Sequence, residues 1–592
     1  MGIRQKKIVE NANSKLKRIS HPKPIYSIIN NHTYEYQKKN WIFILSVCIT
    51  TCIYITLTLN PSLSTSDKNQ SQLNSAVPLW NNLGNIHHKI TTNSPQAQRY
   101  FDQGLTFIFG FNHAEAKRSF QQATQLDSDC AMCYWGMALS EGPNINAPMN
   151  QESIPPAYQA IQKAQKLSTK TTPIEQAYIE ALSQRYSAQN LENRQPLDMA
   201  YVNAMRELSQ QYPNDLDAAT LFAESLMDLM PWNYWQENGE PQPLTNEVVK
   251  TLEFVLEKNP NHPGAIHYYI HALEASPYPE KAEKAADRLR NLVPASGHLV
   301  HMPSHLYLRI GRYHDAASAN QNAIKADEKF LATSQQKGLY SALYYPHNIH
   351  FLWSAASMEG RSEDAINAAR KLVDKVSQQE VKQIPWTEIF LPTPYFSLVQ
   401  FGKWDEILTE SKPSNEFPYT MAMWHYTRGM AWVGKGNLEN AQFEYEKIKD
   451  LLQNAEFSSL ETANVPATNL ISIANHLLVA KMADLKDKNE EMISEYQAAV
   501  KLQDNLPYME PPYWYYPVRL SLGAALLRLN REQEAEAVYR QDLQQHPNNG
   551  WSLYGLAESL SAQGKQKEAE EVKQEFEKAW LEADIKLITS EF

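Results

Sequence analysis

Histidine residues are concentrated in the centre of this sequence. Nine of the 17 histidines lie within residues 262–350, where an even distribution would place fewer than three. Several of them are three or four residues apart, a spacing that puts side chains on one face of a helix. The neutral imidazole is the commonest protein ligand of metal ions. A helical array that brought these faces together would therefore form a metal site.

The elements that must position these histidines are repeated helix pairs. Residues 100–129 (YFDQGLTFIFGFNHAEAKRSFQQATQLDSD) and 309–327 (RIGRYHDAASANQNAIKAD) combine small residues, where two helices touch, with large apolar residues at helical spacing. The same pattern recurs at 428–448, 521–547 and 551–572. It resembles the tetratricopeptide repeat (TPR), a helix–turn–helix unit of about 34 residues. The resemblance covers most of residues 97–580 and implies an all-α, TPR-like α-solenoid with a concave inner wall.

The resemblance also implies which side chains face that wall. In the TPR family, positions 2, 5, 9 and 12 of a unit point inward. Proline and turn signals place the first positions of three successive His-rich units, within residues 262–357, at Pro263, Gly297 and Pro346. The inward positions are then His267, His271, Glu274, His298, His301, His305, His347 and His350. Pro303 falls inside the second of these helices, so we expect that helix to start late or to be kinked.

We predict that these eight residues are the ligands of a transition metal. Because neighbouring packed helices lie about 8–10 Å apart, we expect His267, His301 and His350 to form one layer. His271 and His305 would lie one turn away. Mixed imidazole and carboxylate ligands suit Zn, Fe, Mn or Cu about equally. Seven histidines exceed the needs of one ion, so either some are outer-sphere residues or two ions bind.

Two classes of function follow from this pattern. The first is a metal-dependent protein, an oxidoreductase or a hydrolase with an open coordination position. The second is a non-enzymatic scaffold that binds a peptide or protein partner in its concave groove. Histidines on the wall could also sense pH, and a single histidine in a repeat is commonly a core or surface residue. The sequence lacks GxSxG, HExxH, Walker and GxGxxG patterns, so no further motif chooses between these classes.

The N-terminal segment differs from the repeats. Residues 1–40 form a basic leader with nine Lys or Arg and two Asp or Glu, and residues 41–59 (WIFILSVCITTCIYITLTL) carry no charge. Nineteen helical residues span roughly 28 Å, close to the hydrocarbon thickness of a bilayer. We predict a transmembrane signal anchor that inserts in the lipid bilayer, with a cytoplasmic leader, a linker at 60–90 and an extracytoplasmic solenoid at 91–592, periplasmic or at the cell surface. A cleaved signal peptide is the competing interpretation. The whole resembles a bacterial, membrane-anchored branch of the TPR family.

The charge of the chain excludes one class of partner, and its cysteines and two aromatic segments are further features of the sequence. Beyond residue 40 the chain has 46 Lys or Arg against 64 Asp or Glu, a balance that argues against nucleic-acid binding. Cys130 and Cys133, in the sequence CAMC, either close as a small disulfide outside the cytoplasm or remain as buried thiols. Two aromatic segments, residues 230–247 and 508–527, are expected to be insertions that pack between repeats or cover the groove.

Overall fold

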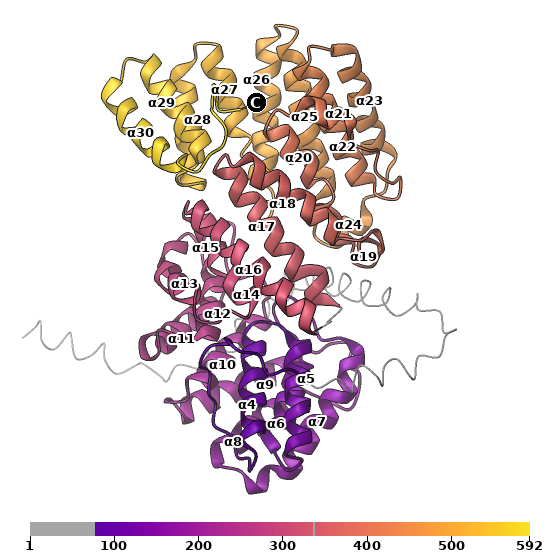
Figure 1. Cartoon of the computed structure of the whole chain (residues 1–592), viewed down its shortest axis with the longest axis vertical. Coiled ribbons are helices and arrows are strands. Elements are labelled where there is room, and N and C mark those ends of the chain that lie inside the picture. The colour runs from indigo at the N-terminus through magenta and orange to yellow at the C-terminus, as the bar shows by residue number, and fades with distance from the viewer. Residues whose placement is uncertain (1–76, 335–337, 592) are drawn as a thin grey trace, which may run out of the picture. The chain divides into compact units, whose positions relative to one another are not determined.

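The computed structural model describes residues 77–334 and 338–591, and within those ranges the chain forms helices and no β-strand (Figure 1). The part up to residue 358 contains α4 (Pro95–Phe109), α5 (His113–Leu126), α6 (Ala131–Ser140), α7 (Ile154–Leu167), α8 (Pro173–Ser183), α9 (Gln195–Gln211), α10 (Leu216–Asp228), α11 (Thr245–Lys258), α12 (Pro263–Leu273), α13 (Glu283–Leu289), α14 (Gly297–His301), α15 (Pro303–Arg309), α16 (Tyr313–Ser334) and α17 (Tyr345–Met358). Short 3-10 or π turns are η2 (Gln151–Ser153), η3 (Ser168–Lys170), η4 (Pro279–Ala282), η5 (Tyr340–Tyr344) and η6 (Pro385–Phe390).

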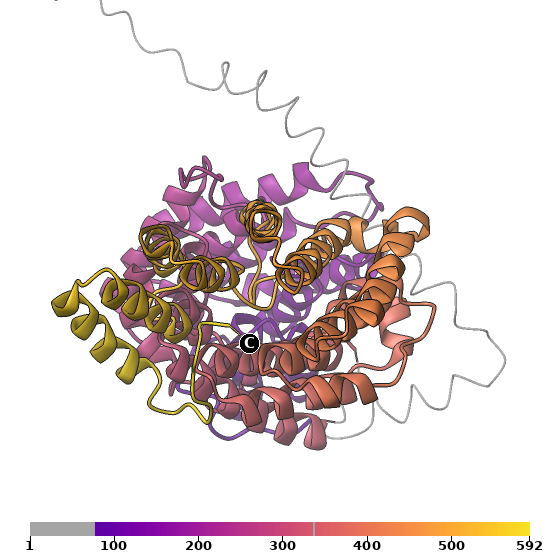
Figure 2. The ribbon, with the colours of Figure 1, turned by 90° about the horizontal axis from the view of Figure 1, so that it is seen from above.

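The remaining helices continue the same hairpin pattern. They are α18 (Ser362–Lys375), α19 (Gln378–Gln383), α20 (Thr393–Gln400), α21 (Trp404–Thr409), α22 (Pro418–Gly434), α23 (Leu438–Asn454), α24 (Ser458–Thr462), α25 (Ala467–Asp484), α26 (Asn489–Asp504), α27 (Arg519–Arg528), α28 (Glu532–Gln545), α29 (Gly550–Ala562) and α30 (Gln566–Ala579). Helices that follow one another in the chain lie side by side, as in the pairs α4–α5, α22–α23 and α25–α26. Figure 2 shows the later pairs, coloured orange to yellow, following a curved path. This arrangement confirms the prediction of an all-α, TPR-like helical repeat.

Local signals in the sequence set where the helices begin. Helix α8 starts at Pro173 behind a capping box, in which the Thr172 hydroxyl accepts from the Glu175 amide and the Glu175 carboxylate accepts from the Thr172 amide. Helix α12 starts at Pro263, and the His262 ring nitrogen Nδ1 accepts from the Ala265 amide. These starts fix the rotation of each helix and so decide which side chains face inward.

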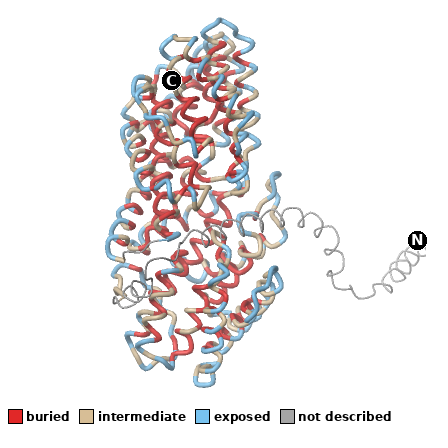
Figure 3. Tube along the Cα trace, turned by 90° about the vertical axis from the view of Figure 1, so that its right-hand side faces the viewer, coloured by how far each residue is buried: buried red, intermediate tan, exposed pale blue. Residues whose placement is uncertain are grey.

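Apolar side chains pack into two core clusters. The first joins helices α4 to α16 with the N-terminal segment, and the second joins α16 and α17 to the C-terminal helices. Helix α16 contributes to both, since Phe330 belongs to the first cluster and Ile324 to the second. Figure 3 shows buried residues along the packed sides of the helices and exposed residues in many of the connecting loops. The His-rich helix α17 also contributes to both clusters, through Ala355 and Ile349, whereas the His-rich helix α12 packs in the first.

The predicted anchor at residues 41–59 and the leader at 1–40 lie outside the described residues, so both remain predictions. None of the helices within 77–334 and 338–591 combines the length and hydrophobicity needed to cross a bilayer. The described end of the segment predicted as a linker packs on the first repeat: Leu83 and Ile90 are buried, and the Trp80 amide donates to the Gln103 side-chain oxygen at 2.8 Å.

Two further expectations concern single residues. The helix that contains Pro303 is interrupted at Met302, so its two halves form α14 and α15. Proline supplies no amide for the helical ladder, which explains the break. Cys130 and Cys133 form a disulfide at the start of α6.

Candidate metal centre

Most of the predicted ligands converge on one buried place. Helix α12 carries His267 and His271, and Glu274 follows at its C-terminal end. The broken helix α14–α15 and helix α17 supply the other imidazoles. The structure groups them as two sets of three, which we call the first triad (His267, His271 and His298) and the second triad (His301, His305 and His347). Within each triad, one ring nitrogen from each histidine lies within 4.8 Å of the other two.

In the first triad, hydrogen bonds fix which ring nitrogen is free. The Nδ1 atom of His267 donates to the Phe109 carbonyl at 2.6 Å, and that of His271 donates to Glu274 Oε1 at 2.7 Å. Each of these two rings therefore keeps a lone pair on Nε2. The Nε2 of His267 lies 3.1 Å from the Nε2 of His298. Among the described residues, the buried His271 Nε2 and His298 Nδ1 have no hydrogen-bond partner.

In the second triad, hydrogen bonds also fix the Nδ1 atoms of two rings. The Asn320 amide nitrogen donates to the Ala316 carbonyl at 2.8 Å, so its oxygen is the acceptor that faces His301 Nδ1 at 2.7 Å. Consequently His301 carries its proton on Nδ1 and has a lone pair on Nε2. The Nδ1 of His305 faces Glu274 Oε2 at 2.5 Å and Glu510 Oε2 at 3.0 Å. The Nε2 atoms of His301 and His305 lie 2.8 Å apart.

In each triad, one pair of nitrogens lies near the separation that a bound metal ion imposes, and the third nitrogen lies within 4.8 Å. A tetrahedral ion with Zn–N bonds of about 2.0–2.1 Å holds its ligand nitrogens about 3.3 Å apart. The observed pairs, at 3.1 and 2.8 Å, need to separate by only a few tenths of an ångström. In four of the six rings, those of His267, His271, His301 and His305, Nδ1 meets a carbonyl, amide or carboxylate oxygen, the usual environment of a metal-ligating histidine. The donor set therefore suits a metal.

Burial sets the protonation states of the triads. Desolvation and mutual repulsion lower the pKa values of five of the six imidazoles: His267, His271, His298, His301 and His347. These five are neutral at physiological pH, as metal ligands must be. Burial alone would also lower the pKa of His305, but Glu274 and Glu510 outweigh it and raise that pKa to about 10.

Glu510 is the residue of the site that sequence reasoning missed. It lies in the segment 508–527, which we expected to pack between repeats or cover the groove, and it is buried. The Tyr508 hydroxyl donates to one of its oxygens, while the other faces His305. Its position as the only acidic residue among aromatic and proline residues was the available signal.

His350 was predicted as a ligand but lies in neither triad. Its ring stacks on Trp353 with centroids 5.0 Å apart and meets the edge of Phe390 at 5.2 Å. Burial alone lowers its pKa to about 3. The predicted layer of His267, His301 and His350 therefore does not form. His350 instead faces residues of the second core cluster.

Aromatic rings enclose the two triads. Phe111 contacts His267 with ring centroids 4.4 Å apart, and Phe351 contacts His301 at 4.6 Å. The two rings reduce the dielectric around the imidazoles, which strengthens electrostatic interactions there. Five triad residues are buried and His347 is half-buried, so the second triad lies nearer to solvent.

A buried aspartate on α16, Asp327, is linked to the first triad through the Tyr340 hydroxyl. The Tyr340 hydroxyl accepts from the His298 amide at 3.3 Å and donates to Asp327 Oδ1 at 2.7 Å. Asn348 donates to Asp327 Oδ2 at 2.7 Å. Burial raises the pKa of Asp327 to about 7, although both hydrogen bonds oppose that rise. The carboxyl group is thus half-protonated near neutral pH.

The variant Asp327→Asn tests this raised pKa. Because the folded pKa exceeds the ordinary value, the free energy of unfolding should fall as pH rises from about 4 to about 7, and the variant should lack this slope. At pH 8 we expect the variant to be more stable by about 1–3 kcal/mol. Its new amide can donate to Asn348 Oδ1, which has no partner among the described residues. Urea denaturation at pH 5 and pH 8 measures the effect.

The control for this test is Asp405→Asn, which replaces an exposed aspartate that pairs with Lys435. It should keep the wild-type dependence on pH. An unchanged pH slope in Asp327→Asn would show that Asp327 is ionised in the folded protein, contrary to this interpretation.

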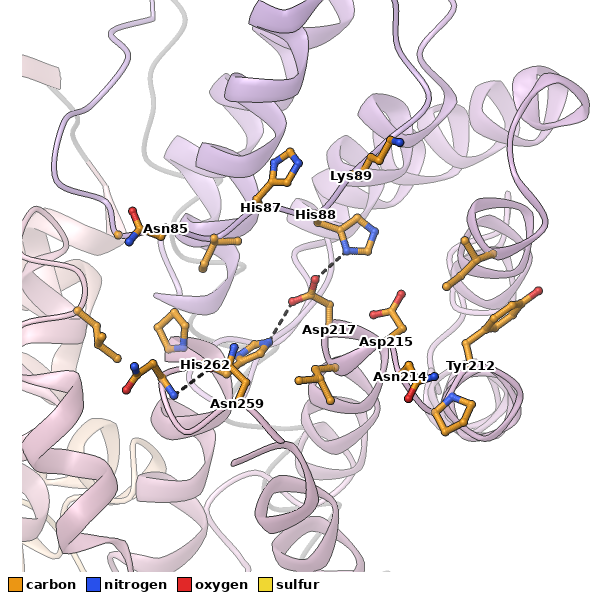
Figure 4. A pocket seen from close by; sticks show the side chains of 18 of the residues that line it. Asn85, His87, His88, Lys89, Tyr212, Asn214, Asp215, Asp217, Asn259 and His262 are labelled. Carbon is orange, nitrogen blue, oxygen red and sulfur yellow. Dashed lines mark hydrogen bonds and ion pairs between the residues drawn. The ribbon is translucent and has the colours of Figure 1, made fainter. Parts of the chain in front are cut away.

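A second polar cluster lines a cavity of about 870 Å³ beside the N-terminal segment. Figure 4 shows Asp217 between His88 and His262, which donate to its two oxygens at 2.7 and 3.0 Å. His262 also caps α12, and Asp215 caps α10 while accepting from the Tyr178 hydroxyl. Because these bonds already satisfy the polar groups, the cluster is explained by its role in holding three segments together.

Comparisons with known proteins show likeness of fold only. No protein-family model matches this chain, and no curated protein matches its sequence. Among solved structures, the human IFIT1 dimer with m7Gppp-AAAA has a TM-score of 0.30 and 12% identity, covering 83% of this chain and 91% of that one. Yeast Tom70 has a TM-score of 0.25 and 14% identity, covering 82% and 94%. The APC/C hetero-tetramer Cut9–Hcn1 has a TM-score of 0.23 and 14% identity, covering 81% and 90%. Similarity at this level transfers no function to the chain.

Proposed function

We propose that this protein binds a transition metal at the buried imidazole cluster. The observation that carries the proposal is the orientation of the rings, since hydrogen bonds on Nδ1 leave Nε2 lone pairs on His267, His271 and His301. The Nε2 atoms of His298 and His305 lie 3.1 and 2.8 Å from those of His267 and His301. In the metal-free protein His305 is protonated, and a bound ion would take the place of its Nε2 proton. Two ring nitrogens this close to each other must share a proton or a metal ion, because two lone pairs at this distance would repel. Burying this many polar rings is costly without such a partner.

The donor types favour some ions over others. The converging atoms of both triads are imidazole nitrogens, whereas Glu274 hydrogen-bonds to Nδ1 atoms that point away from the centre. Imidazole ligands suit Cu, Zn, Fe and Ni, while Mn prefers oxygen ligands. Of the four metals expected from the sequence, Cu and Zn therefore fit best, followed by Fe.

A site with three imidazole ligands leaves a coordination position for a substrate or water. A metal in such a site acts as a Lewis acid for hydrolysis or, if it is redox-active, as an electron carrier. We therefore propose a metal-dependent oxidoreductase or hydrolase built on a helical repeat. The half-buried His347 marks the side from which a small substrate would approach. The proposed anchor at residues 41–59 would hold this centre outside the cytoplasm, where a disulfide such as Cys130–Cys133 persists.

Metal analysis tests the proposal directly. The purified protein, stripped with chelator and then dialysed against Cu²⁺ or Zn²⁺, should retain stoichiometric metal by mass spectrometry. The variant His267→Ala/His271→Ala/His305→Ala should retain less than a tenth of it, because it loses ligands from both triads. A matched control, His87→Ala/His314→Ala/His476→Ala, removes three histidines that lie outside the cluster and should bind as the wild type does.

Circular dichroism of each variant separates loss of ligands from loss of fold. A wild-type protein that retains no metal under these conditions would overturn the proposal. The protein would then be better described as a scaffold that binds a peptide or protein partner in the groove of its helical repeat.

A further inference from the structure

The cluster contains two complete ligand sets that share no residue. Each triad by itself supplies three imidazole nitrogens within 4.8 Å of one another. Three imidazoles are sufficient to hold one catalytic ion with an open position. Six histidines are more than one ion needs. They form two equal sets of three ligands, and not a single set surrounded by outer-sphere residues.

We propose, resting on the metal binding proposed above, that the centre is dinuclear, with one ion on each triad. The two sets adjoin closely: ring centroids of His271 and His305 are 5.5 Å apart, and those of His298 and His301 are 5.9 Å apart. Two ions held by these sets would be neighbours, as in known two-metal sites.

Glu274 links the two ion sites. Its Oε1 accepts from His271 of the first triad, and its Oε2 accepts from His305 of the second. One carboxylate thus orients a ligand of each ion, a positioning role that fixes both rings relative to each other. Of the six triad histidines, Glu510 pairs with His305, which makes the second site dependent on the segment 508–527.

Counting ions per chain tests the dinuclear centre. Wild-type protein loaded with Cu²⁺ should bind two ions, and the variants His267→Gln/His298→Gln and His301→Gln/His347→Gln should bind one each. The control His350→Gln should still bind two, because that ring lies outside both triads. Glutamine keeps most of the side-chain volume and polarity, which favours folding of each variant.

Electron paramagnetic resonance supplies a readout that needs no variant. Two adjacent Cu²⁺ ions couple magnetically, so the wild-type signal should account for much less than the total copper. The signal of each one-ion variant should account for all of its copper. One ion per wild-type chain, or two ions with a full uncoupled signal, would overturn the dinuclear centre while leaving metal binding intact. Absence of any bound metal would instead contradict the proposed function.

Discussion

Replacement of Glu274 by alanine should destabilise the metal-free protein by about 3–5 kcal/mol. The Glu274 side chain is buried and pairs with two imidazoles, so its loss leaves the His305 cation with Glu510 as its remaining carboxylate partner. A buried charge that loses one of its two partners is compensated less completely, because water does not replace the lost carboxylate. Metal affinity should fall about 10–100-fold, because the carboxylate orients one ligand in each triad. Urea denaturation and competitive metal titration measure the two effects.

The effect on stability should depend on pH. Burial opposes ionisation of Glu274, but His305 and His271 hold its pKa at about 2. Its contribution is therefore complete above the ordinary pKa of 4.5 and lost as pH falls through 2. The contribution of His305, with a pKa of about 10, is complete below 6.5 and lost as pH rises through 10. The variant should differ most from the wild type between pH 4.5 and 6.5.

The matched control is Glu283→Ala, which removes a more exposed carboxylate that pairs with Arg312. We expect a change of less than about 0.5 kcal/mol and no change in metal affinity. Equal destabilisation by Glu274→Ala and Glu283→Ala would contradict the conclusion that Glu274 is a buried partner of two imidazoles.

Replacement of Gly311 by alanine should destabilise the protein by about 2–5 kcal/mol, the sum of backbone strain and a steric clash. Gly311 has a φ angle of +74°, which L side chains rarely adopt. A Cβ atom at this position would lie 2.0 Å from the Pro547 carbonyl oxygen, which cannot move aside as a flexible side chain can. Asn548 also donates to the Gly311 carbonyl at 3.3 Å. Thermal unfolding followed by circular dichroism measures the loss.

Gly436→Ala separates the two causes. Gly436 has a φ angle of +71°, but an added Cβ would meet nothing within 4 Å. It should therefore suffer only the strain, about 1–2 kcal/mol. Equal losses of stability in the two alanine variants would show that a Cβ at Gly311 meets no obstacle, and that the turn between α15 and α16 does not lie close to Pro547.

Much of the candidate site was predictable from helix periodicity together with the inward-facing positions that the TPR resemblance implies. The register that begins at Pro263 matches the observed start of α12, so His267 and His271 share one face as expected. The same reasoning placed Glu274 beside them and brought in His298, His301 and His305. It succeeded because hairpin repeats with small residues at their contacts impose nearly the same rotation on each successive helix.

Periodicity was less accurate where helices end or break. His347 and His350 are three residues apart, so their side chains leave the helix about 60° apart around its axis. One ring can therefore join the second triad while the other turns toward Trp353. Pro303 also separates His301 from His305 into different helices, yet their Nε2 atoms still meet. The inward-facing position of a residue in its repeat predicts neither the separation of His347 from His350 nor the meeting of His301 and His305.

The sequence by itself determined the all-α repeat, the enrichment of histidine in three successive units and the helix faces that carry most of these residues. These are local properties, set by the period of apolar residues and by proline at helix starts. Only the tertiary structure decided the division into two triads, the exclusion of His350 and the contribution of Glu510. Those features depend on contacts between segments far apart in the chain, and no local spacing records such contacts.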